Sequence, residues 1–593
     1  MPTNAQSIAR TVDQAGCGHL FTLMGDGNMH LILALDAAGI AIVEVRHESA
    51  AVAMAEGYGW SSGRVGVCSV THGPGLSHTA TSLLVASRNR SPLVVLAGET
   101  PTGYAGAQRF DQRRLVEACE ATYWAVTAGD DAGAVVASAM AEAAKHRRPV
   151  VVGIPADLFD LPAAEALPTA EALPTAGDLP TAGDLPTAGA DQLGRAGSLR
   201  AVEALLDEIA RAERPVLLAG RGVLASGSAD LVRELAETIG AALSTTLPAK
   251  GLFDGHPLDI GIAGGLSHPD AEPVIDQADL VLAIGASAGA STTRSGRLFP
   301  AARLVRLDAK ELDAKELDAR EVDAREVDAG RRNGQAGGQR GVQVQGEAHA
   351  VLTGVLERLR SDEARRPTWF EPSRPWPECW RTELADYQPA LAPGTLDPRL
   401  AVLDLDPALP EDAVIVVSNG HCSGFASALL RTGAPRSFHL AQGFGSIGQG
   451  LTTAIGVALG APERRVVVFE GDAAFMMHAQ ELDTAVRAGA RLTAFVFNDE
   501  ALGTEYHRLS DARDGGDLAL VPAPGITDVA RALGAFGVQV TRDSDVVGAA
   551  KEALQVRTSV VELRTSRSVE SRHLRWRQLI DRSADVPEGA HVH

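Results

Sequence analysis

The stretch that decides the fold reads Val466-Val-Val-Phe-Glu-Gly471-Asp472-Ala-Ala-Phe and, after a helical segment, Leu492-Thr-Ala-Phe-Val-Phe-Asn498-Asp499. Each of its two short apolar runs ends in a carboxylate, and the segment between them, Ala479–Ala488, has the composition of a helix. The two carboxylates lie 27 residues apart, the length of one strand–helix–strand crossover. We therefore predict two neighbouring parallel strands with Asp472 and Asp499 at their carboxyl ends, where open α/β sheets bind ligands.

Two oxygen ligands at such an edge suit Mg²⁺ or Ca²⁺, and Mg²⁺ usually completes its coordination with phosphate oxygens and water. The small residues Ala473 and Ala474 leave backbone N–H groups of the following helix free to receive an anion. The alternative is that each aspartate only caps a helix. This stretch alone leaves both interpretations open.

Comparable apolar runs alternate with helical stretches along the whole chain, which predicts an α/β protein with three doubly wound, mostly parallel sheets. The predicted strands are Ala41–Val45, Val65–Val70, Leu93–Ala97 and Val150–Ile154; Val216–Ala219, Leu280–Ile284 and Leu304–Leu307; and Val414–Val417, Val466–Phe469, Ala494–Phe497 and Val560–Leu563.

Two repeats interrupt this pattern. A proline-containing hexad runs from Leu161 to Ala190, and a five-residue unit runs from Leu307 to Ala329. Proline every six residues prevents a continuous helix, and a five-residue period matches neither helix nor strand, so we interpret both as surface insertions. The predicted organisation is a first domain at 1–160, a linker at 161–195, a middle domain at 196–360 with an insertion at 308–341, a third domain at 375–570 and a tail at 571–593.

The chain is acidic, with 54 Lys and Arg against 75 Asp and Glu and a net charge of −21. Such a surface repels phosphate backbones, which argues against a nucleic-acid partner. Residues 161–190 and 308–328 together hold −9 of this charge, so the rest of the chain is only mildly acidic. The five widely spaced cysteines and the absence of a long apolar run favour a cytoplasmic location without a membrane partner.

The first domain carries a second group of polar residues at predicted strand ends. Arg46-His47-Glu48 follows one strand, and Thr71-His72-Gly73-Pro74-Gly75 follows the next. Taken alone, Glu48 after Arg-His is equally consistent with an ion-paired strand end, and His72 with a polar strand end.

Together with Gly443-Phe-Gly-Ser-Ile-Gly448 and the two aspartates, these motifs resemble the thiamine diphosphate-dependent enzymes of the acetohydroxyacid synthase and pyruvate decarboxylase superfamily. The resemblance covers almost the whole chain outside the repeats, in the order pyrimidine-binding, middle and diphosphate-binding domain. It implies a thiamine diphosphate cofactor with Mg²⁺ and, because family active centres combine two chains, a homodimer or a dimer of dimers.

The resemblance also implies residue roles. Glu48 would hydrogen-bond the aminopyrimidine ring, the Gly445 carbonyl would accept from its amine, and Ile447 would hold the cofactor in its bent shape. Metal ligands would be the side chains of Asp472 and Asp499 and the carbonyl of Ala501. The residues expected to contact the diphosphate are Gly420, His421, Ser423, Gly471, Asp472, Ala473, Ala474 and Asp499.

The sequence also departs from the family pattern. Ala473 replaces the usual glycine, and Asp499 replaces the usual asparagine, which keeps an oxygen ligand but adds a charge. The flavin-contacting arginine of the synthases has no match near Ile284, which argues against FAD.

Three hypotheses for the activity remain open. The motifs favour decarboxylation of a pyruvate-like 2-oxo acid with transfer of the acyl unit to a carbonyl acceptor. The first alternative is a simple decarboxylase that releases aldehyde, with Asp26 and Glu505 as proton donors and His72 in place of the family's missing histidine pair. The second is a non-catalytic homologue.

Overall fold

The computed structural model describes residues 1–104, 106–164, 192–294, 296–309, 342–360, 366–434, 437–513, 515–523 and 525–575. The proline hexads from residue 165 onward and the five-residue repeat from residue 310 onward lie outside these ranges. The described residues form three six-stranded sheets in which every neighbouring pair of strands is parallel, and this confirms the predicted α/β class. In this part of the chain no helix has the length and apolar character that crossing a membrane requires.

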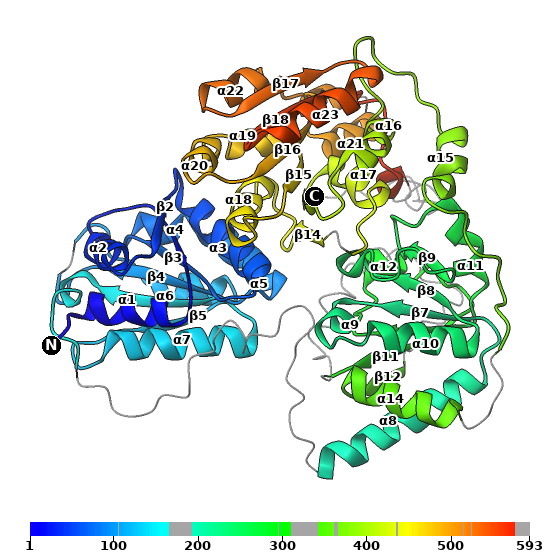
Figure 1. Cartoon of the computed structure of the whole chain (residues 1–593), viewed down its shortest axis with the longest axis horizontal. Coiled ribbons are helices and arrows are strands. Elements are labelled where there is room, and N and C mark those ends of the chain that lie inside the picture. The colour runs from blue at the N-terminus through cyan, green and yellow to red at the C-terminus, as the bar shows by residue number, and fades with distance from the viewer. Residues whose placement is uncertain are drawn as a thin grey trace. The chain divides into compact units, whose positions relative to one another are not determined.

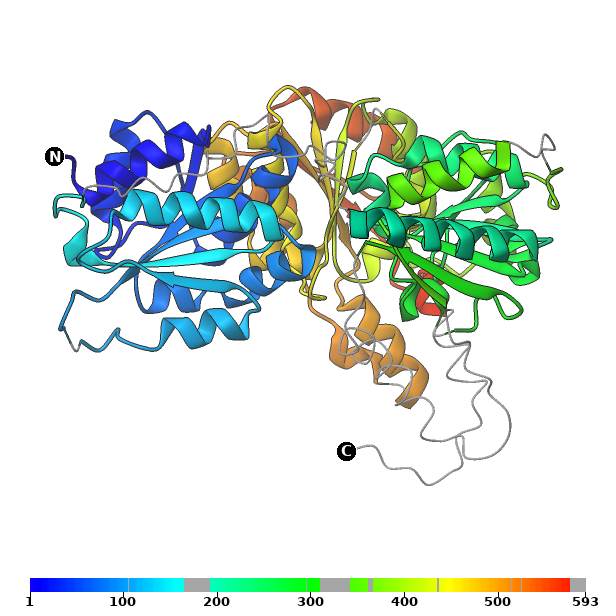
Figure 2. The same ribbon diagram turned by 90° about the horizontal axis from the view of Figure 1, so that it is seen from below.

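The first sheet has the strand order β2-β1-β3-β4-β6-β5. Its helix α1 begins after Thr3, whose side chain accepts a hydrogen bond from the Gln6 backbone, and α1 packs against α7 (Figure 2). The strands are β1 (His19–Thr22), β2 (Ala41–Glu44), β3 (Gly66–Val70), β4 (Leu93–Glu99), β5 (Thr122–Ala125) and β6 (Val150–Pro155). The helices are α1 (Asn4–Gln14), α2 (Met29–Ala37), α3 (Glu48–Ser62), α4 (Pro74–Ser77), α5 (Ala80–Asn89), α6 (Gln112–Ala118) and α7 (Ala132–His146).

The third sheet repeats this order as β14-β13-β15-β16-β18-β17. The strands are β13 (Val414–Ser418), β14 (Ser437–Ala441), β15 (Val466–Gly471), β16 (Leu492–Asn498), β17 (Phe536–Val540) and β18 (Thr558–Arg564). The helices are α16 (Pro398–Leu405), α17 (His421–Leu429), α18 (Gly450–Gly460), α19 (Asp472–Met477), α20 (Glu481–Arg487), α21 (Gly503–Arg513), α22 (Ile526–Ala532) and α23 (Val546–Gln555). A further helix, α15 (Arg381–Asp386), precedes them in the chain and belongs to the compact unit of the middle sheet.

The middle sheet has a different order, β12-β11-β10-β7-β8-β9, which is the doubly wound 3-2-1-4-5-6 arrangement read from its other edge. The strands are β7 (Pro215–Ala219), β8 (Ala242–Thr245), β9 (Asp259–Ile262), β10 (Leu280–Ile284), β11 (Arg303–Asp308) and β12 (Val342–Gln345). The helices are α8 (Gln192–Ala210), α9 (Arg221–Ala225), α10 (Ala229–Ile239), α11 (Glu272–Gln277), α12 (Ala290–Thr293) and α14 (Ala348–Arg360).

The predicted strands are all present, but seven strands of the structure escaped the sequence pattern: β1, β5, β8, β9, β12, β14 and β17. Each of them is only four or five residues long, and most mix polar with apolar side chains, as His19–Thr22 does. A short mixed segment gives no periodic signal, so its pairing is decided by the neighbouring strands.

The chain divides into two compact units. The first comprises Met1–Leu179, Leu391–Ser423 and Arg436–Arg567 and contains the first and third sheets; the second comprises Pro180–Ala390, Gly424–Pro435 and Ser568–His593 and contains the middle sheet. In the first unit one continuous apolar core joins side chains from both sheets.

Helices α3 and α18 make the closest approach between the two sheets of the first unit (Figure 1). A Cβ atom added to Gly456 would lie 1.9 Å from the Met54 carbonyl oxygen, and one added to Gly57 would lie 2.2 Å from the Thr453 carbonyl oxygen. Both positions therefore require glycine, because each helix backbone rests directly on the other.

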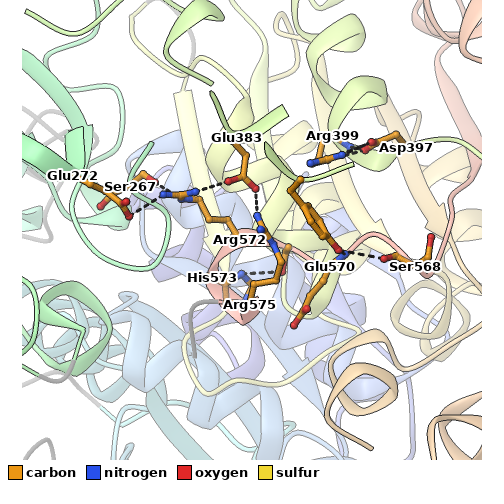
Figure 3. A network of polar contacts seen from close by, with 12 residues as sticks. Ser267, Glu272, Glu383, Asp397, Arg399, Ser568, Glu570, Arg572, His573 and Arg575 are labelled. Atoms are coloured by element: carbon orange, nitrogen blue, oxygen red, sulfur yellow. Dashed lines mark hydrogen bonds and ion pairs between the residues drawn. The ribbon is translucent and has the colours of Figure 1, made fainter. Parts of the chain in front are cut away.

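In the second unit, a C-terminal segment is held by charge-assisted hydrogen bonds (Figure 3). Arg572 pairs with Glu272 at 2.8 Å and also with Glu383, and Arg575 pairs with the same Glu383. The carboxylate of Glu383 is buried and accepts from both guanidinium groups, which fixes residues 572–575 to this unit.

Candidate active site

Asp472 and Asp499 lie at adjacent strand ends of the third sheet. Asp472 follows β15 and Asp499 follows β16, and the register pairs Gly471, one residue before Asp472, with Phe497, two residues before Asp499. The two carboxylate oxygens of Asp472 accept hydrogen bonds from the backbone N–H groups of Ala473 at 2.7 Å and Glu500 at 2.8 Å. The Asp499 carboxylate accepts from the Ala501 N–H at 3.0 Å. The backbone therefore orients both acids.

The electrostatics of this pair suit a bound cation. Burial raises the pKa of Asp472 to about 6, and burial together with the Asp472 charge raises the pKa of Asp499 to about 7. Among the described residues, neither carboxylate forms an ion pair with a lysine or arginine side chain. A divalent cation would supply the missing positive charge, and the donor set of two carboxylates and a nearby carbonyl is of the kind that Mg²⁺ accepts.

Glu500, which lies between Asp499 and Ala501 in the chain, has a left-handed backbone with a φ of 57°. This conformation is costly for a residue with a side chain and is typical of functional sites. It directs the Glu500 N–H toward Asp472, while the Glu500 carboxylate pairs with Arg564 at 3.1 Å and with Arg567 at 3.6 Å. Glu500 therefore links the chain next to Asp499 to the Asp472 carboxylate through its N–H group. Its own carboxylate pairs with arginines and not with the acid pair.

The residues predicted to surround the diphosphate and the pyrimidine lie on neighbouring loops of the same sheet. The Asn419 side chain donates to the Gly445 carbonyl, and the Ser423 hydroxyl donates to the Gly420 carbonyl at 2.7 Å. A Cβ added to Gly420 would touch the Ile447 side chain at 3.9 Å. The Gly445 carbonyl, expected to accept from the cofactor amine, already accepts from Asn419 here.

Glu48 begins helix α3 in the first sheet and is buried. The Nδ1 atom of His78 lies 3.0 Å from one of its carboxylate oxygens. The ring of His47 stacks on that of His78 with a centroid distance of 5.0 Å. Potential ligand atoms of His47, Glu48 and His78 lie within 4.8 Å of one another, so Glu48 sits in a compact group of imidazoles.

His478 connects this group to the third sheet. Its Nε2 atom lies 3.0 Å from the Ser49 hydroxyl, which also lies 2.7 Å from Nδ1 of His47. Burial lowers the pKa of His478 to about 4, so this ring is neutral at neutral pH, and burial also lowers the pKa of His47. His478 also lies beside the loop of Gly445 and Ile447, because a Cβ on Gly448 would be 3.3 Å from its ring. In the first unit His478 therefore contacts both Ser49, the residue after Glu48, and the loop that contains Gly445 and Ile447.

Asp26 and His72 form a separate small group. The carboxylate of exposed Asp26 lies 3.9 Å from Nε2 of buried His72, and the same nitrogen lies 2.7 Å from the Gln108 side-chain oxygen. A Cβ on Gly27 would lie 2.2 Å from the other ring nitrogen of His72, so this turn admits only glycine there. The structure therefore brings these two predicted residues together.

Glu505 stands apart from them. It is exposed in the first turn of α21, and within the described residues no hydrogen bond or ion pair joins it to Asp26 or His72. Sequence reasoning also missed three polar neighbours of the predicted residues: His78, His478 and Asn419. Only their positions in the sequence could have drawn attention to them. His78 lies three residues after Gly75, His478 lies six residues after Asp472, and Asn419 directly precedes Gly420.

The described residues also form a cavity of about 620 Å³ in the second unit, and none of the predicted site residues lines it. Its polar lining consists mainly of Glu272, Asp276, Glu383, Asp386 and Arg572. The charges of Glu272, Glu383 and Arg572 are already paired with one another. We therefore locate the candidate active site by its chemistry in the first unit rather than by cavity size.

The fold and the acid pair define an α/β enzyme built from three sheet domains, and comparisons with protein families identify its class. Residues 2–119 match the N-terminal TPP binding domain of thiamine pyrophosphate enzymes, residues 202–325 match their central domain, and residues 418–563 match their C-terminal TPP binding domain. The chain belongs to the thiamine pyrophosphate enzymes and depends on this cofactor, thiamine diphosphate.

Its relatives have several activities. A sulfoacetaldehyde acetyltransferase of Castellaniella defragrans is 28% identical over 608 residues, which cover 96% of this chain and 94% of that protein. An acetolactate synthase large subunit of Parasynechococcus marenigrum is 29% identical, covering 84% and 76%. A probable 2-ketoarginine decarboxylase of Pseudomonas aeruginosa is 29% identical, covering 92% and 90%.

Proposed function

We propose that this enzyme uses Mg²⁺ with its cofactor to decarboxylate a pyruvate-like 2-oxo acid and transfers the acyl unit to a carbonyl acceptor. The observation that carries the proposal is the backbone-oriented acid pair Asp472 and Asp499, and the burial of Glu48 at the start of α3 supports it. Similarity to an acetyltransferase and to acetolactate synthases supports acyl transfer.

We assign the cation to the third sheet. Asp472 and Asp499 would bind Mg²⁺ through carboxylate oxygens and Ala501 through its carbonyl, and the bound ion would neutralise part of the diphosphate charge. The residues that we assign to the diphosphate itself are Gly420, His421, Ser423, Gly471, Ala473 and Ala474.

We assign the pyrimidine end to Glu48, the Gly445 carbonyl and Ile447. When bound, the cofactor supplies the electron sink for decarboxylation. Glu48 holds a proton at its carboxylate against the aminopyrimidine ring, and its burial keeps this contact free of competing water. The Gly445 carbonyl accepts one hydrogen bond from Asn419 and keeps a second lone pair for the cofactor amine.

A simple decarboxylase that releases aldehyde is the second candidate. The neighbouring Asp26 and His72 support it, because two titratable groups 3.9 Å apart are arranged to deliver a proton. Similarity to a probable 2-ketoarginine decarboxylase also supports it. The exposed Glu505 would need to move to join them.

For the assembly we propose a homodimer or a dimer of dimers that acts on small molecules in the cytoplasm, with no nucleic-acid partner and no FAD. We assign pyrimidine binding to the domain of residues 1–160 and diphosphate binding to the domain of residues 375–570. Residues 196–360 form the middle domain. Sedimentation of the full chain with and without cofactor measures the assembly.

Product analysis tests the reaction. The enzyme with thiamine diphosphate and Mg²⁺ is given pyruvate alone and then with a second oxo acid, an aldehyde or sulfoacetaldehyde, and CO₂, aldehyde and ligation products are quantified. We expect CO₂ and a ligation product; aldehyde without ligation across the panel selects the decarboxylase instead. Glu48→Gln should lower kcat by about 10²–10⁴-fold, and unchanged turnover in this variant contradicts the role of Glu48.

A further inference from the structure

Glu48 is almost sealed from water, and His78 lies on its open side. The Glu48 side chain is 10% exposed, whereas that of His78 is 51% exposed. Among the described residues, the His78 ring is the only group whose hydrogen bond to the Glu48 carboxylate is seen, at 3.0 Å. A proton that reaches Glu48 from solvent through a side chain therefore passes His78.

The other titratable groups around this pair are engaged elsewhere. His47, stacked on His78, and His478 both contact the Ser49 hydroxyl. Glu481, from α20, accepts hydrogen bonds from the Arg46 backbone at 2.9 Å and from the Thr484 hydroxyl at 2.7 Å.

The Arg46 guanidinium, two residues before Glu48 in the chain, donates to Asp483 at 2.9 Å. Neither Arg46 nor Glu481 contacts the Glu48 carboxylate. The exchangeable proton nearest to Glu48 is accordingly the one shared with His78.

We propose that His78 is a positioning residue that relays protons between solvent and the Glu48 carboxyl group. In the relay, Nε2 of His78 takes a proton from a hydronium ion of the solvent, which leaves water, while Nδ1 gives its proton to the Glu48 oxygen. One proton moves inward, and His78 returns to the neutral state as its other tautomer. The reverse sequence unloads Glu48. This inference rests on the proposed role of Glu48.

The test compares His78→Asn and His78→Gln with the unchanged enzyme and with His146→Gln. His146 is a matched control, because its ring lies 3.5 Å from Glu142 in a pair where both side chains are exposed, at 49% and 37%. For each protein, kcat and KM are measured from pH 5 to 9 with saturating thiamine diphosphate and Mg²⁺, with and without added imidazole. Thermal unfolding confirms that each variant is folded, and Gln keeps an amide donor for Glu48.

We expect both His78 variants to lose at least about tenfold in kcat with little change in KM, as for a group that acts only in the chemical steps. The pH profile of kcat in both variants should differ in shape from that of the unchanged enzyme. Imidazole should restore part of kcat in the variants and leave the unchanged enzyme and His146→Gln as they were.

An unaltered pH profile in folded His78 variants, or a loss of kcat that imidazole does not restore, overturns the relay. Stimulation of the unchanged enzyme by imidazole also overturns it, because an intact relay needs no external carrier. Glu48→Gln separates the two proposals: if that variant stays fully active, the proposed role of Glu48 fails, whereas an inactive Glu48→Gln beside unaffected His78 variants rejects the relay alone.

Discussion

The first and third sheets share one strand order, yet their corresponding strand ends carry opposite chemistry. After β3 the chain continues with Thr71 and His72, and after the corresponding strand β15 it continues with Asp472 and Ala473. Helices α3 and α18 also correspond, and they pack on each other. The two sheets thus have the same topology but different residues at their carboxyl edges. The edge of the first sheet carries Glu48 and imidazole groups, and the edge of the third sheet carries the paired carboxylates.

The largest effect is expected from removing the acid pair of the third sheet. Asp472→Asn takes away one proposed Mg²⁺ ligand, so Mg²⁺ affinity should fall by more than the about 10–100-fold typical of losing an outer-shell partner. Titration of Mg²⁺ in the presence of thiamine diphosphate, followed by calorimetry, measures this. Asp483→Asn, on α20, is the control with an unchanged Mg²⁺ affinity. If Asp472→Asn bound Mg²⁺ as tightly as Asp483→Asn does, the acid pair would not be the Mg²⁺ site, and the proposed chemical difference between the two sheets would be wrong.

The next effect concerns the contact that joins the two sheets. Gly456→Ala places a Cβ against the Met54 carbonyl and should lower the free energy of unfolding by about 1–3 kcal/mol or more. Gly548→Ala, in α23 with nothing within 4 Å of the new Cβ, should instead stabilise by up to about 1 kcal/mol. Chemical denaturation of both variants decides whether the close approach of α3 and α18 is as tight as described.

A smaller effect is expected from pH in the absence of Mg²⁺ and cofactor. The pKa values of Asp472 and Asp499, about 6 and 7, lie above the ordinary 3.8, so the folded protein binds more protons than the unfolded chain between about pH 4 and 7. This contribution to stability is complete below that window and is lost as pH rises through it. Asp499→Asn should reduce the loss by roughly 2–3 kcal/mol, measured as unfolding free energy at pH 5 and pH 8. An identical pH dependence in the variant would contradict the raised pKa values.

The smallest effect on stability is expected from the exposed ion pair between Arg46 of the first sheet and Asp483 of the third. Arg46→Met removes the ion pair with Asp483, whose side chains are 51% and 27% exposed, and should cost about 0–1 kcal/mol. The backbone bond from Arg46 to Glu481 remains in this variant. A loss well above 1 kcal/mol would mean that this exposed ion pair contributes as much to joining the sheets as the glycine contact does.

The sequence predicted the parts of this molecule that depend on local pattern. Apolar runs such as Val466–Phe469 identified the long central strands, and the 27-residue spacing between Asp472 and Asp499 brought two acids to neighbouring strand ends because parallel strands finish at the same edge. The assignment of these acids to a metal stays a prediction.

Contacts between distant segments left no such pattern. Glu48 and His78 are separated by 30 residues, and Ser49 and His478 by 429, and these pairs meet only through the packing of whole helices and sheets. The exposure of Glu505 is likewise set by the placement of α21, which its spacing from Asp499 does not reveal.

The contact between α3 and α18 has a consequence for biosynthesis. Gly57 and Gly456 are separated by 399 residues, so at roughly 5–20 residues per second the second helix is made about 20–80 s after the first. Residues 48–59 of α3 are all buried in the finished protein. During that interval the apolar surface of α3 that faces α18 has no partner from its own chain, and slow translation prolongs the period in which the nascent first sheet is prone to aggregate.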